Sequence, residues 1–423
     1  MVAMRLYTVL LSLAVTAVSV CAQRTPDTMT GSFDETIKTL SVRLDGDDFA
    51  PPVFVPGTDM RLNFSFDHLS DDREYFRYSL THCNAAWQPD GLSDIEFLDG
   101  FNEGTIDNYE YSRGTTLPYV HYWFSIPNEN IIPKISGNYL LKIYPEHNPD
   151  SVVAQCRFMV SEATAPVAAR VSSQTDIDYN AAHQQLEIEV DTHRADVDDP
   201  FNDIMVVVGQ NGRLDSEVSL RHPLRSNGRT LVYGHQQPLI FEAGNEYRRF
   251  ETVNERYPGM GVNFIEFNDP YYHFVLHTDA PRRDESYSYD QTQHGRFLVR
   301  RQNAGNSDTE AEYVVVHFSL DYPASTDALI FLDGDFTDRR FDANARMYYN
   351  NATGLYERAL LLKQGSYNYQ YLIVPPEAKR GYTDGIEGDR YQTSNEYFIR
   401  VYNRRPGDRY DRLIGTALIS NFK

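Results

Sequence analysis

The sequence lacks any apolar run that could cross a membrane as a helix once its first 22 residues are set aside, because such a helix needs roughly 20 apolar residues in succession. It also lacks the signatures of zinc hydrolases, phosphate-binding loops, nucleophile elbows and dinucleotide sites. Cysteine is scarce, with 3 residues in 423. These absences remove the specific sequence arguments for an enzyme, and we expect no catalytic residues, cofactor or metal.

Basic side chains are few relative to acidic ones. The chain has 39 Lys and Arg against 60 Asp and Glu, a formal net charge of −21. A surface of this sign repels nucleic acid and anionic lipid. The composition therefore argues against nucleic acid as a partner and against direct insertion into a membrane.

The first 22 residues have the form of a secretory signal peptide. Arg5 supplies the positive end, an apolar run follows, and small residues precede Gln23. Cleavage after Ala22 would release a soluble, exported chain. A lipoprotein leader with an acylated Cys21 is the rival interpretation, but Val20 is a poor residue to precede a lipid-modified cysteine.

Aromatic residues are abundant, with 30 Tyr and 23 Phe, and they favour strands over helices. Between residues 33 and 162, short alternating runs are separated by turn residues, which is the pattern of a β-sandwich. These runs are Thr39–Leu44, Met60–Phe66, Tyr75–His82, His121–Ile126, Asn138–Tyr144 and Val152–Val160.

The same pattern continues through two further blocks. Their clearest runs are Leu186–Val190, Ile204–Val208, Tyr313–Phe318, Ala328–Leu332, Tyr356–Leu362 and Tyr367–Val374. Polar segments at 162–166 and 301–310 are typical of linkers. We predict a mostly β chain with little helix and three tandem immunoglobulin-like β-sandwich domains in series, at residues 23–164, 165–305 and 306–423.

His82 and Cys83 stand side by side and invite a catalytic interpretation. Adjacent residues of a strand point to opposite faces, however, so this thiol and imidazole are badly placed to act together. The turn Pro89-Asp-Gly91 follows shortly after. We therefore predict a strand end with a packed cysteine.

Cys83 and Cys156 are the two cysteines that remain after the leader. They can pair in an oxidising compartment. The spacing of Trp87 from Cys83 does not match the immunoglobulin pattern of cysteine, tryptophan and cysteine. A disulfide and two separately buried thiols both stay open.

Carboxylates recur in three turns, at Asp45–Asp48, Asp196–Asp199 and Asp333–Asp338. Alternating Asp and Gly can bind calcium, but a helix-flanked calcium loop also needs a later glutamate and two helices, which are not evident. We predict solvated turns.

The third block resembles the glycogen-binding type of early-set β-sandwich. The likeness rests on Ala328–Asp338, Met347 and Gly354–Tyr371. In that family an aromatic residue after the Gly-Asp-Phe turn stacks on sugar rings, and here Arg339 holds that position. The resemblance implies the sandwich without its sugar ligand.

A wider resemblance covers nearly the whole mature chain and points to the type IX secretion system plug protein family. The words that carry it occur in the family's order: Thr81-His-Cys-Asn-Ala-Ala-Trp87, Phe97-Leu-Asp-Gly-Phe-Asn-Glu103, His121-Tyr, Pro127-Asn-Glu-Asn130, Ser136-Gly-Asn-Tyr-Leu-Leu141, Arg157-Phe-Met-Val160, Gly244-Asn-Glu-Tyr-Arg-Arg-Phe250, Leu362-Lys-Gln-Gly365, Glu387-Gly388 and Arg409-Tyr-Asp-Arg-Leu-Ile-Gly415.

The resemblance implies a non-enzymatic periplasmic protein, monomeric within its complex. Such a protein binds the inner mouth of the outer-membrane translocon barrel and seals its pore when no cargo is engaged. An exported carbohydrate-binding accessory protein is the alternative. That alternative predicts a row of exposed aromatic side chains on the third block.

Two segments are candidates for the docking surface. One is the loop from Trp87 to Asn102, where Trp87, Phe97, Leu98 and Phe101 lie among turn residues. The other is the basic C-terminal segment, with Arg404, Arg405, Arg409, Tyr410 and Arg412. Each has a purely structural alternative, because the loop can fold over its own sandwich and the arginines can pair with local aspartates.

Overall fold

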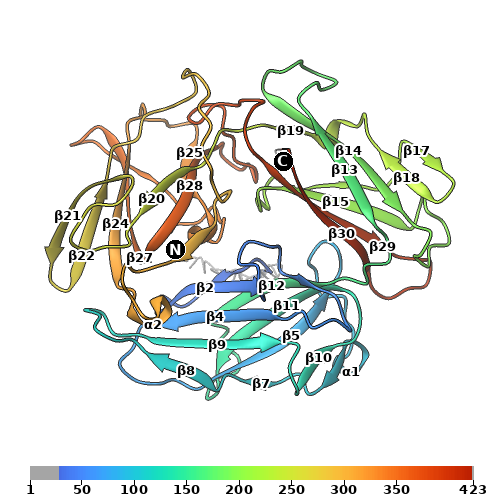
Figure 1. Cartoon of the computed structure of the whole chain (residues 1–423), viewed down its shortest axis with the longest axis horizontal. Coiled ribbons are helices and arrows are strands. Elements are labelled where there is room, and N and C mark those ends of the chain that lie inside the picture. Colours follow the sequence, from blue (N-terminus) through green and yellow to red (C-terminus); the bar gives the residue numbers. More distant parts are fainter. Residues whose placement is uncertain (1–27, 422–423) are drawn as a thin grey trace, which may run out of the picture.

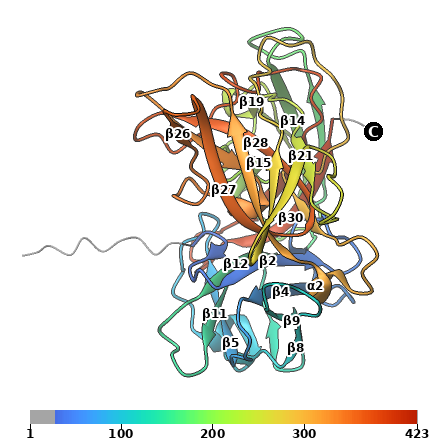
Figure 2. The same ribbon diagram turned by 90° about the vertical axis from the view of Figure 1, so that its left-hand side faces the viewer.

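The computed structural model describes residues 28–421 and contains three lobes, each built from two β-sheets around its own hydrophobic core. The predicted leader, with Cys21, lies outside the described residues. Lobe 1 lies below lobes 2 and 3, which stand side by side (Figures 1 and 2). The mostly β prediction is confirmed, and the two α-helices of the described chain have four residues each, α1 (Asp94–Phe97) and α2 (Ser307–Glu310).

Lobe 1 spans residues 28–162. One sheet has the order β1 (Gly31–Ser32), β12 (Ala154–Val160), β11 (Gly137–Pro145), β5 (Phe76–Cys83) and β7 (Gly104–Thr105), with β3 (Val53–Phe54) parallel to β12. The facing sheet has the order β2 (Ile37–Leu44), β4 (Leu62–His68), β9 (Val120–Ile126) and β8 (Asn108–Tyr111). A small ladder joins β6 (Leu98–Gly100) to β10 (Ile131–Pro133).

Alternation along each strand builds this core. On β4, Leu62, Phe64 and Phe66 are buried, whereas Asn63 is exposed. Successive residues of a strand face opposite sides, so one face carries the apolar side chains. Phe64 stacks on Phe124, with 5.2 Å between the ring centroids.

Lobe 2 combines residues 163–247 with the C-terminal residues 394–421. One sheet has the order β13 (Val167–Ser172), β14 (His183–Asp191), β18 (Thr230–Tyr233) and β17 (Arg225–Asn227), with β19 (Ile240–Glu242) also on β14 after the 3-10 turn η1 (Gln237–Leu239). The other has the order β16 (Val218–Leu220), β15 (Ile204–Gln210), β29 (Glu396–Asn403) and β30 (Arg412–Ser420).

Lobe 3 spans residues 248–393. One sheet contains β20 (Arg248–Glu251), β28 (Gly365–Val374) and β23 (Phe297–Val299), with β25 (Leu329–Asp333) also on β28 and followed by the 3-10 turn η2 (Asp335–Thr337). The other has the order β21 (Val262–Asn268), β22 (Tyr271–Leu276), β24 (Tyr313–Leu320), β27 (Leu355–Lys363) and β26 (Tyr348–Asn350).

The strand pairing departs from the boundary expected between residues 305 and 306. β29 and β30, from the expected third block, complete a sheet of lobe 2, and Ile399 and Val401 join its core. β20, from the expected second block, pairs with β28 in lobe 3. Alternation determines which face of a strand is buried, but it does not determine which strand lies beside it in the sheet. Lobe 3 is therefore inserted into lobe 2, and the lobes do not follow one another as a simple series.

Cys83 and Cys156 are both buried and free, so the possible disulfide is absent. β11 separates their strands by two spacings, and the β11 residues that face the two cysteines, Asn138 and Leu141, are three positions apart, so the cysteines lie more than about 10 Å apart. The side chains also face opposite sides, since Cys156 lies in the core of lobe 1 and Cys83 pairs across the ladder with Asn138 on the outer face. A bridge cannot form at that separation without moving the backbone.

Candidate functional site at the lobe contacts

His82 and Cys83 end strand β5, as the sequence predicted, and they are not a catalytic pair. His82 is 2 % exposed; its Nδ1 lies 2.5 Å from Asp90 Oδ2, and its Nε2 lies 3.1 Å from the Ser136 carbonyl oxygen. Burial raises the pKa of the Cys83 thiol to about 12, and the negative charge of Asp90 contributes to this increase. A thiol that stays protonated at neutral pH is not a nucleophile.

Three of the four apolar candidates in the loop from Trp87 to Asn102 are buried. Phe97 and Leu98 belong to the core of lobe 1. Trp87 packs in a separate apolar cluster between lobes 1 and 2, and the guanidinium of Arg157 lies 4.5 Å from its ring centroid. The interpretation of these three as an exposed docking surface is therefore wrong. Phe97 and Leu98 fill the core of their own sandwich, and Trp87 fills its contact with lobe 2. Phe101 alone stays exposed, at 86 %.

The basic C-terminal segment pairs with acidic groups of the same chain. Arg412 makes a two-pronged contact with Glu162, at 2.9 and 2.8 Å. Arg409 pairs with Glu96, Arg405 with Asp196 at 2.6 Å, and Arg404 with Asp411 at 3.4 Å. Tyr410 lies edge-on to the His82 ring.

Two of these ion pairs join lobes 1 and 2, because Glu162 and Glu96 belong to lobe 1, whereas Asp196 and Asp411 belong to lobe 2. The Ala85 amide N–H also donates to Asp411 at 2.8 Å, and the Tyr402 hydroxyl donates to Asn138 at 2.7 Å. Charge reversal at Arg409 or Arg412 would break lobe contacts, so it cannot isolate a docking effect. Whether any of this segment also contacts a partner stays a prediction.

A buried ion pair joins lobe 1 to lobe 3. Lys363 Nζ lies 2.5 Å from Asp67 Oδ2, although the two residues are 296 positions apart. The same carboxylate accepts from the Tyr313 hydroxyl at 2.6 Å and meets His121 Nδ1 at 2.7 Å. Burial opposes its charge, yet Lys363 and His121 hold the pKa of Asp67 below its ordinary value. Sequence reasoning missed this cluster, and no local pattern marks it.

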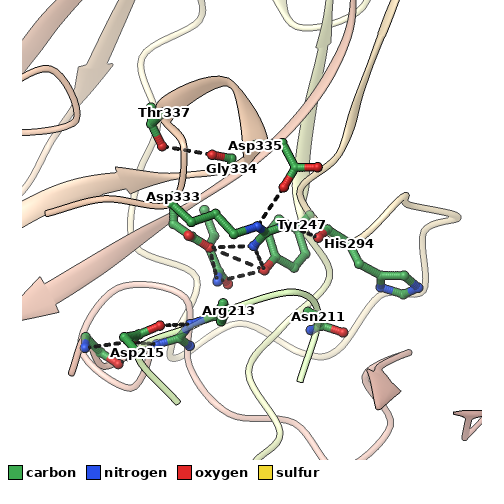
Figure 3. Close-up of polar contacts among 12 residues, drawn as sticks. Asn211, Arg213, Asp215, Tyr247, His294, Asp333, Gly334, Asp335 and Thr337 are labelled. Atoms are coloured by element: carbon green, nitrogen blue, oxygen red, sulfur yellow. Dashed lines mark hydrogen bonds and ion pairs between the residues drawn. The ribbon is translucent and has the colours of Figure 1, made fainter. Parts of the chain in front are cut away.

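Lobes 2 and 3 meet at a second polar cluster (Figure 3). Arg213 donates to the Gly381 carbonyl at 2.7 Å and pairs with Asp215 at 2.6 Å, while the Gly381 amide N–H donates to Asp215 at 2.9 Å. Tyr247 and Asp333 lie nearby and share hydrogen bonds with Gln370. Both lobes are therefore tied by groups that water does not reach.

Arg339 occupies the position where the glycogen-binding family has its stacking aromatic residue, and it points into the protein. Its side chain is 7 % exposed; it pairs with Asp335 at 2.7 Å and donates to the His294 carbonyl oxygen at 2.6 Å. A sugar ring has no access to this position. The expected solvated turn at Asp333–Asp338 is also wrong, because Asp333 and Thr337 are buried at this contact between lobes.

Asp338 links the same turn to lobe 1. It accepts a hydrogen bond from the Ser32 backbone N–H, and burial raises the pKa of Asp338 to about 7. Both Asp338 and Arg339 have left-handed backbone angles, with φ of 52° and 49°. Such angles are uncommon outside glycine and persist where the surrounding structure holds them.

Replacing Asp338 by Asn is expected to stabilise the protein more at pH 8 than at pH 5. The raised pKa means that folded Asp338 keeps its proton between about pH 4 and pH 7 while the unfolded chain has lost it, so wild-type stability falls as pH rises through this window. Thermal unfolding of both proteins at the two pH values measures the effect. The exposed Asp327→Asn variant is the control, and an equal shift of Tm at both pH values would rule out a titrating Asp338.

A cavity of ≈290 Å³ lies where the three lobes meet. Its lining includes Trp87 and Arg157 from lobe 1, Arg400 from lobe 2, and Arg296 and Arg339 from lobe 3. The last three arginines are paired with Glu217, Glu396 and Asp335, respectively. The cavity therefore offers little uncompensated charge to a ligand.

Among residues 28–421, no group of three or more His, Cys, Asp or Glu side chains is arranged to hold a metal ion. No helix within the same range is long and apolar enough to span a bilayer.

The sequence of lobe 1 decides the family. Residues 37–162 match the model of the type 9 secretion system plug protein 1st domain. The chain belongs to the type IX secretion plug protein family. This confirms the resemblance seen in the sequence, and it points to a role in type IX secretion.

A solved structure supports the same fold for this plug-family chain. It is described as a hypothetical protein from Parabacteroides merdae ATCC 43184, is 40 % identical, and aligns with a TM-score of 0.92 over 93 % of this chain and 99 % of its own. A fragment of alpha-2-macroglobulin from Escherichia coli is 13 % identical over 46 % of this chain and 97 % of its own, and its TM-score of 0.16 is too low to indicate a shared fold. The search of curated proteins gave no match.

Proposed function

We propose that this protein is a non-enzymatic periplasmic plug that binds the inner mouth of the type IX translocon and seals its pore when no cargo is engaged. The observation that carries the proposal is the match of residues 37–162 to the plug protein domain. The expected leader agrees with an exported protein. The acidic net charge disfavours anionic lipid and nucleic acid as partners.

The lobe contacts support the sealing role on physical grounds. A stopper in a wide pore has to resist deformation, and a packed interior transmits force because its density approaches that of a crystal. Three lobes tied by Asp67 with Lys363, Arg412 with Glu162, and Arg213 with Gly381 would move as one body. The protein then acts by shape, and its partner is the translocon barrel.

Deletion of the gene tests the proposal in cells. We expect secretion of type IX cargo to continue while the outer membrane becomes permeable to a large hydrophilic antibiotic or dye that the wild type excludes. Re-expression of the full chain should restore the barrier. An unchanged permeability in the deletion strain, measured with the translocon present at its normal level, would rule out sealing.

A further inference from the structure

We propose that the exposed tip of lobe 1 formed by Ile95, Phe101 and Ile132 is the surface that docks onto the translocon. We define these three side chains as the apolar tip. The inference rests on the proposed function and adds the contact surface and the chemistry of its partner: a protein wall that offers an apolar recess bordered by Lys or Arg.

Exposure is the first observation. Phe101 is 86 % exposed and Ile95 is 79 % exposed, the two highest values for large hydrophobic side chains in residues 28–421. Ile132 adds a third side chain at 43 %. Single exposed hydrophobic residues are ordinary, but the two most exposed ones stand six positions apart in one short segment.

Hydrogen bonds tie together the segments that carry the three side chains. The Asn102 side chain donates to Asp94 Oδ1 at 2.9 Å, which ties the residue after Phe101 to the residue before Ile95. Lys134 Nζ donates to the Ile95 carbonyl oxygen at 2.8 Å, which ties the end of β10 to α1. Ile132 pairs with Asp99 across the ladder of β10 and β6.

The tip is also rigid before any partner binds. Ser93 and Glu96 form a capping box at the start of α1, with the Ser93 backbone N–H donating to Glu96 at 2.8 Å. At Gly100, with φ of 103°, an added Cβ would lie 1.9 Å from the Asn130 carbonyl oxygen, so the close approach of β6 to β10 requires glycine. A surface that is ordered in advance loses less entropy on binding.

Charge identifies the kind of partner. Asp94, Asp99 and Glu129 are exposed acidic residues at the border of the tip, and the exposed basic residues nearby are Lys134 and Arg409, of which Arg409 is paired with Glu96. Glu129 lies two residues before the start of β10, and Asp99 faces Ile132 directly across the ladder. An apolar centre with an acidic border is complementary to an apolar recess with a basic border. An anionic membrane would be repelled by the same border.

The location agrees with docking. α1 and β10 lie at the rim of lobe 1, below lobes 2 and 3 in Figure 1. Glu96, the residue after Ile95, pairs with Arg409 of lobe 2, yet Ile95 stays 79 % exposed, so the lobe contact leaves the apolar tip uncovered. A partner can therefore cover the tip without displacing another lobe.

The test is retention of the translocon from solubilised outer membranes of the source bacterium by the tagged, full-length protein. The variant carries Ile95→Ser and Phe101→Ser, and the matched control carries Ile177→Ser and Tyr179→Ser in lobe 2, where the side chains are 60 % and 70 % exposed. Thermal unfolding should show that both variants keep the wild-type Tm. The translocon subunit is identified by mass spectrometry.

We expect wild type and control to retain the translocon and the Ile95/Phe101 variant to retain about tenfold less, since central apolar anchors dominate interface energies. Equal retention by all three proteins would overturn the docking surface and leave the plug function intact. No retention by wild type would instead count against the plug function. Flotation of wild type, but not of the variant, on phosphatidylethanolamine–phosphatidylglycerol vesicles would overturn a protein partner in favour of lipid.

Discussion

Lys363→Ala is expected to lower the free energy of unfolding by about 3–5 kcal/mol, which is the usual cost of removing one partner of a buried ion pair. The variant leaves Asp67 charged, 0 % exposed and without its ammonium partner. His121 and Tyr313 would still contact the carboxylate, and neither supplies a permanent positive charge. Equilibrium unfolding in urea measures the loss.

An exposed ion pair gives the control for this prediction. Arg170 pairs with Glu187 at 2.5 Å, but the Arg170 side chain is 77 % exposed. Surface pairs of this kind contribute about 0–1 kcal/mol, so Arg170→Ala should stay close to wild type. If Lys363→Ala were as mild as Arg170→Ala, the contact between lobes 1 and 3 would not depend on this pair.

Glu387→Gln is expected to remove much of the acid sensitivity of the protein. Glu387 is 0 % exposed and pairs with Arg282 at 2.6 Å and Arg248 at 3.0 Å, and the Tyr371 backbone N–H donates to it at 3.0 Å. Burial opposes its charge, but the two guanidinium groups lower the pKa of Glu387 to about 2. The neutral amide cannot pair with both arginines, so the variant should be less stable than wild type at pH 7.

The sign of the pH effect follows from the lowered pKa. Stabilisation by Glu387 is complete above its unfolded pKa and is lost as pH falls towards its folded pKa, so the wild type loses stability in acid that the variant does not. We expect the gap between the two proteins to narrow by about 2 kcal/mol between pH 5 and pH 3. Urea unfolding at both pH values measures it, with Glu129→Gln as an exposed control. A gap that stays constant would contradict the lowered pKa.

The strands of lobe 1 could be predicted from the sequence because their alternation is local. The run Met60–Phe66 corresponds to β4 and the run Asn138–Tyr144 to β11, within two residues at the ends. In each, the side chains on one face are apolar and the turn residues mark the limits. The class of fold follows from such runs.

Strand partners and buried charges could not be predicted, because they depend on residues far apart in the chain. Asp67 and Lys363 look like ordinary solvated residues until the fold brings them together. β15 pairs with β29, although all of lobe 3 lies between them in the sequence. No local feature of either strand identifies the other as its partner. The turn at Asp333–Asp338 has the composition of a surface turn, yet Asp333 and Thr337 are buried, while the Asp335 side chain stays 42 % exposed.

Some of the short motifs that carry the family resemblance fall at buried ion pairs. Arg248 and Glu387 form the buried pair of lobe 3, and the Asn245 side chain donates to the Glu387 carbonyl oxygen at 2.8 Å. Leu362-Lys-Gln-Gly365 contains Lys363, which joins lobe 1 to lobe 3. The family motifs therefore include residues that hold the lobes together, and the motif Phe97–Glu103 also contains Phe101 of the apolar tip.

Electrical conductance of the purified translocon in a planar lipid bilayer tests the central claim most directly. The open barrel should conduct, and addition of the purified full-length protein to the periplasmic side should reduce the current to near the level of the bare bilayer. The Ile95→Ser, Phe101→Ser variant should need a higher concentration for the same reduction. A current that the wild-type protein leaves unchanged at saturating concentration would contradict the plug.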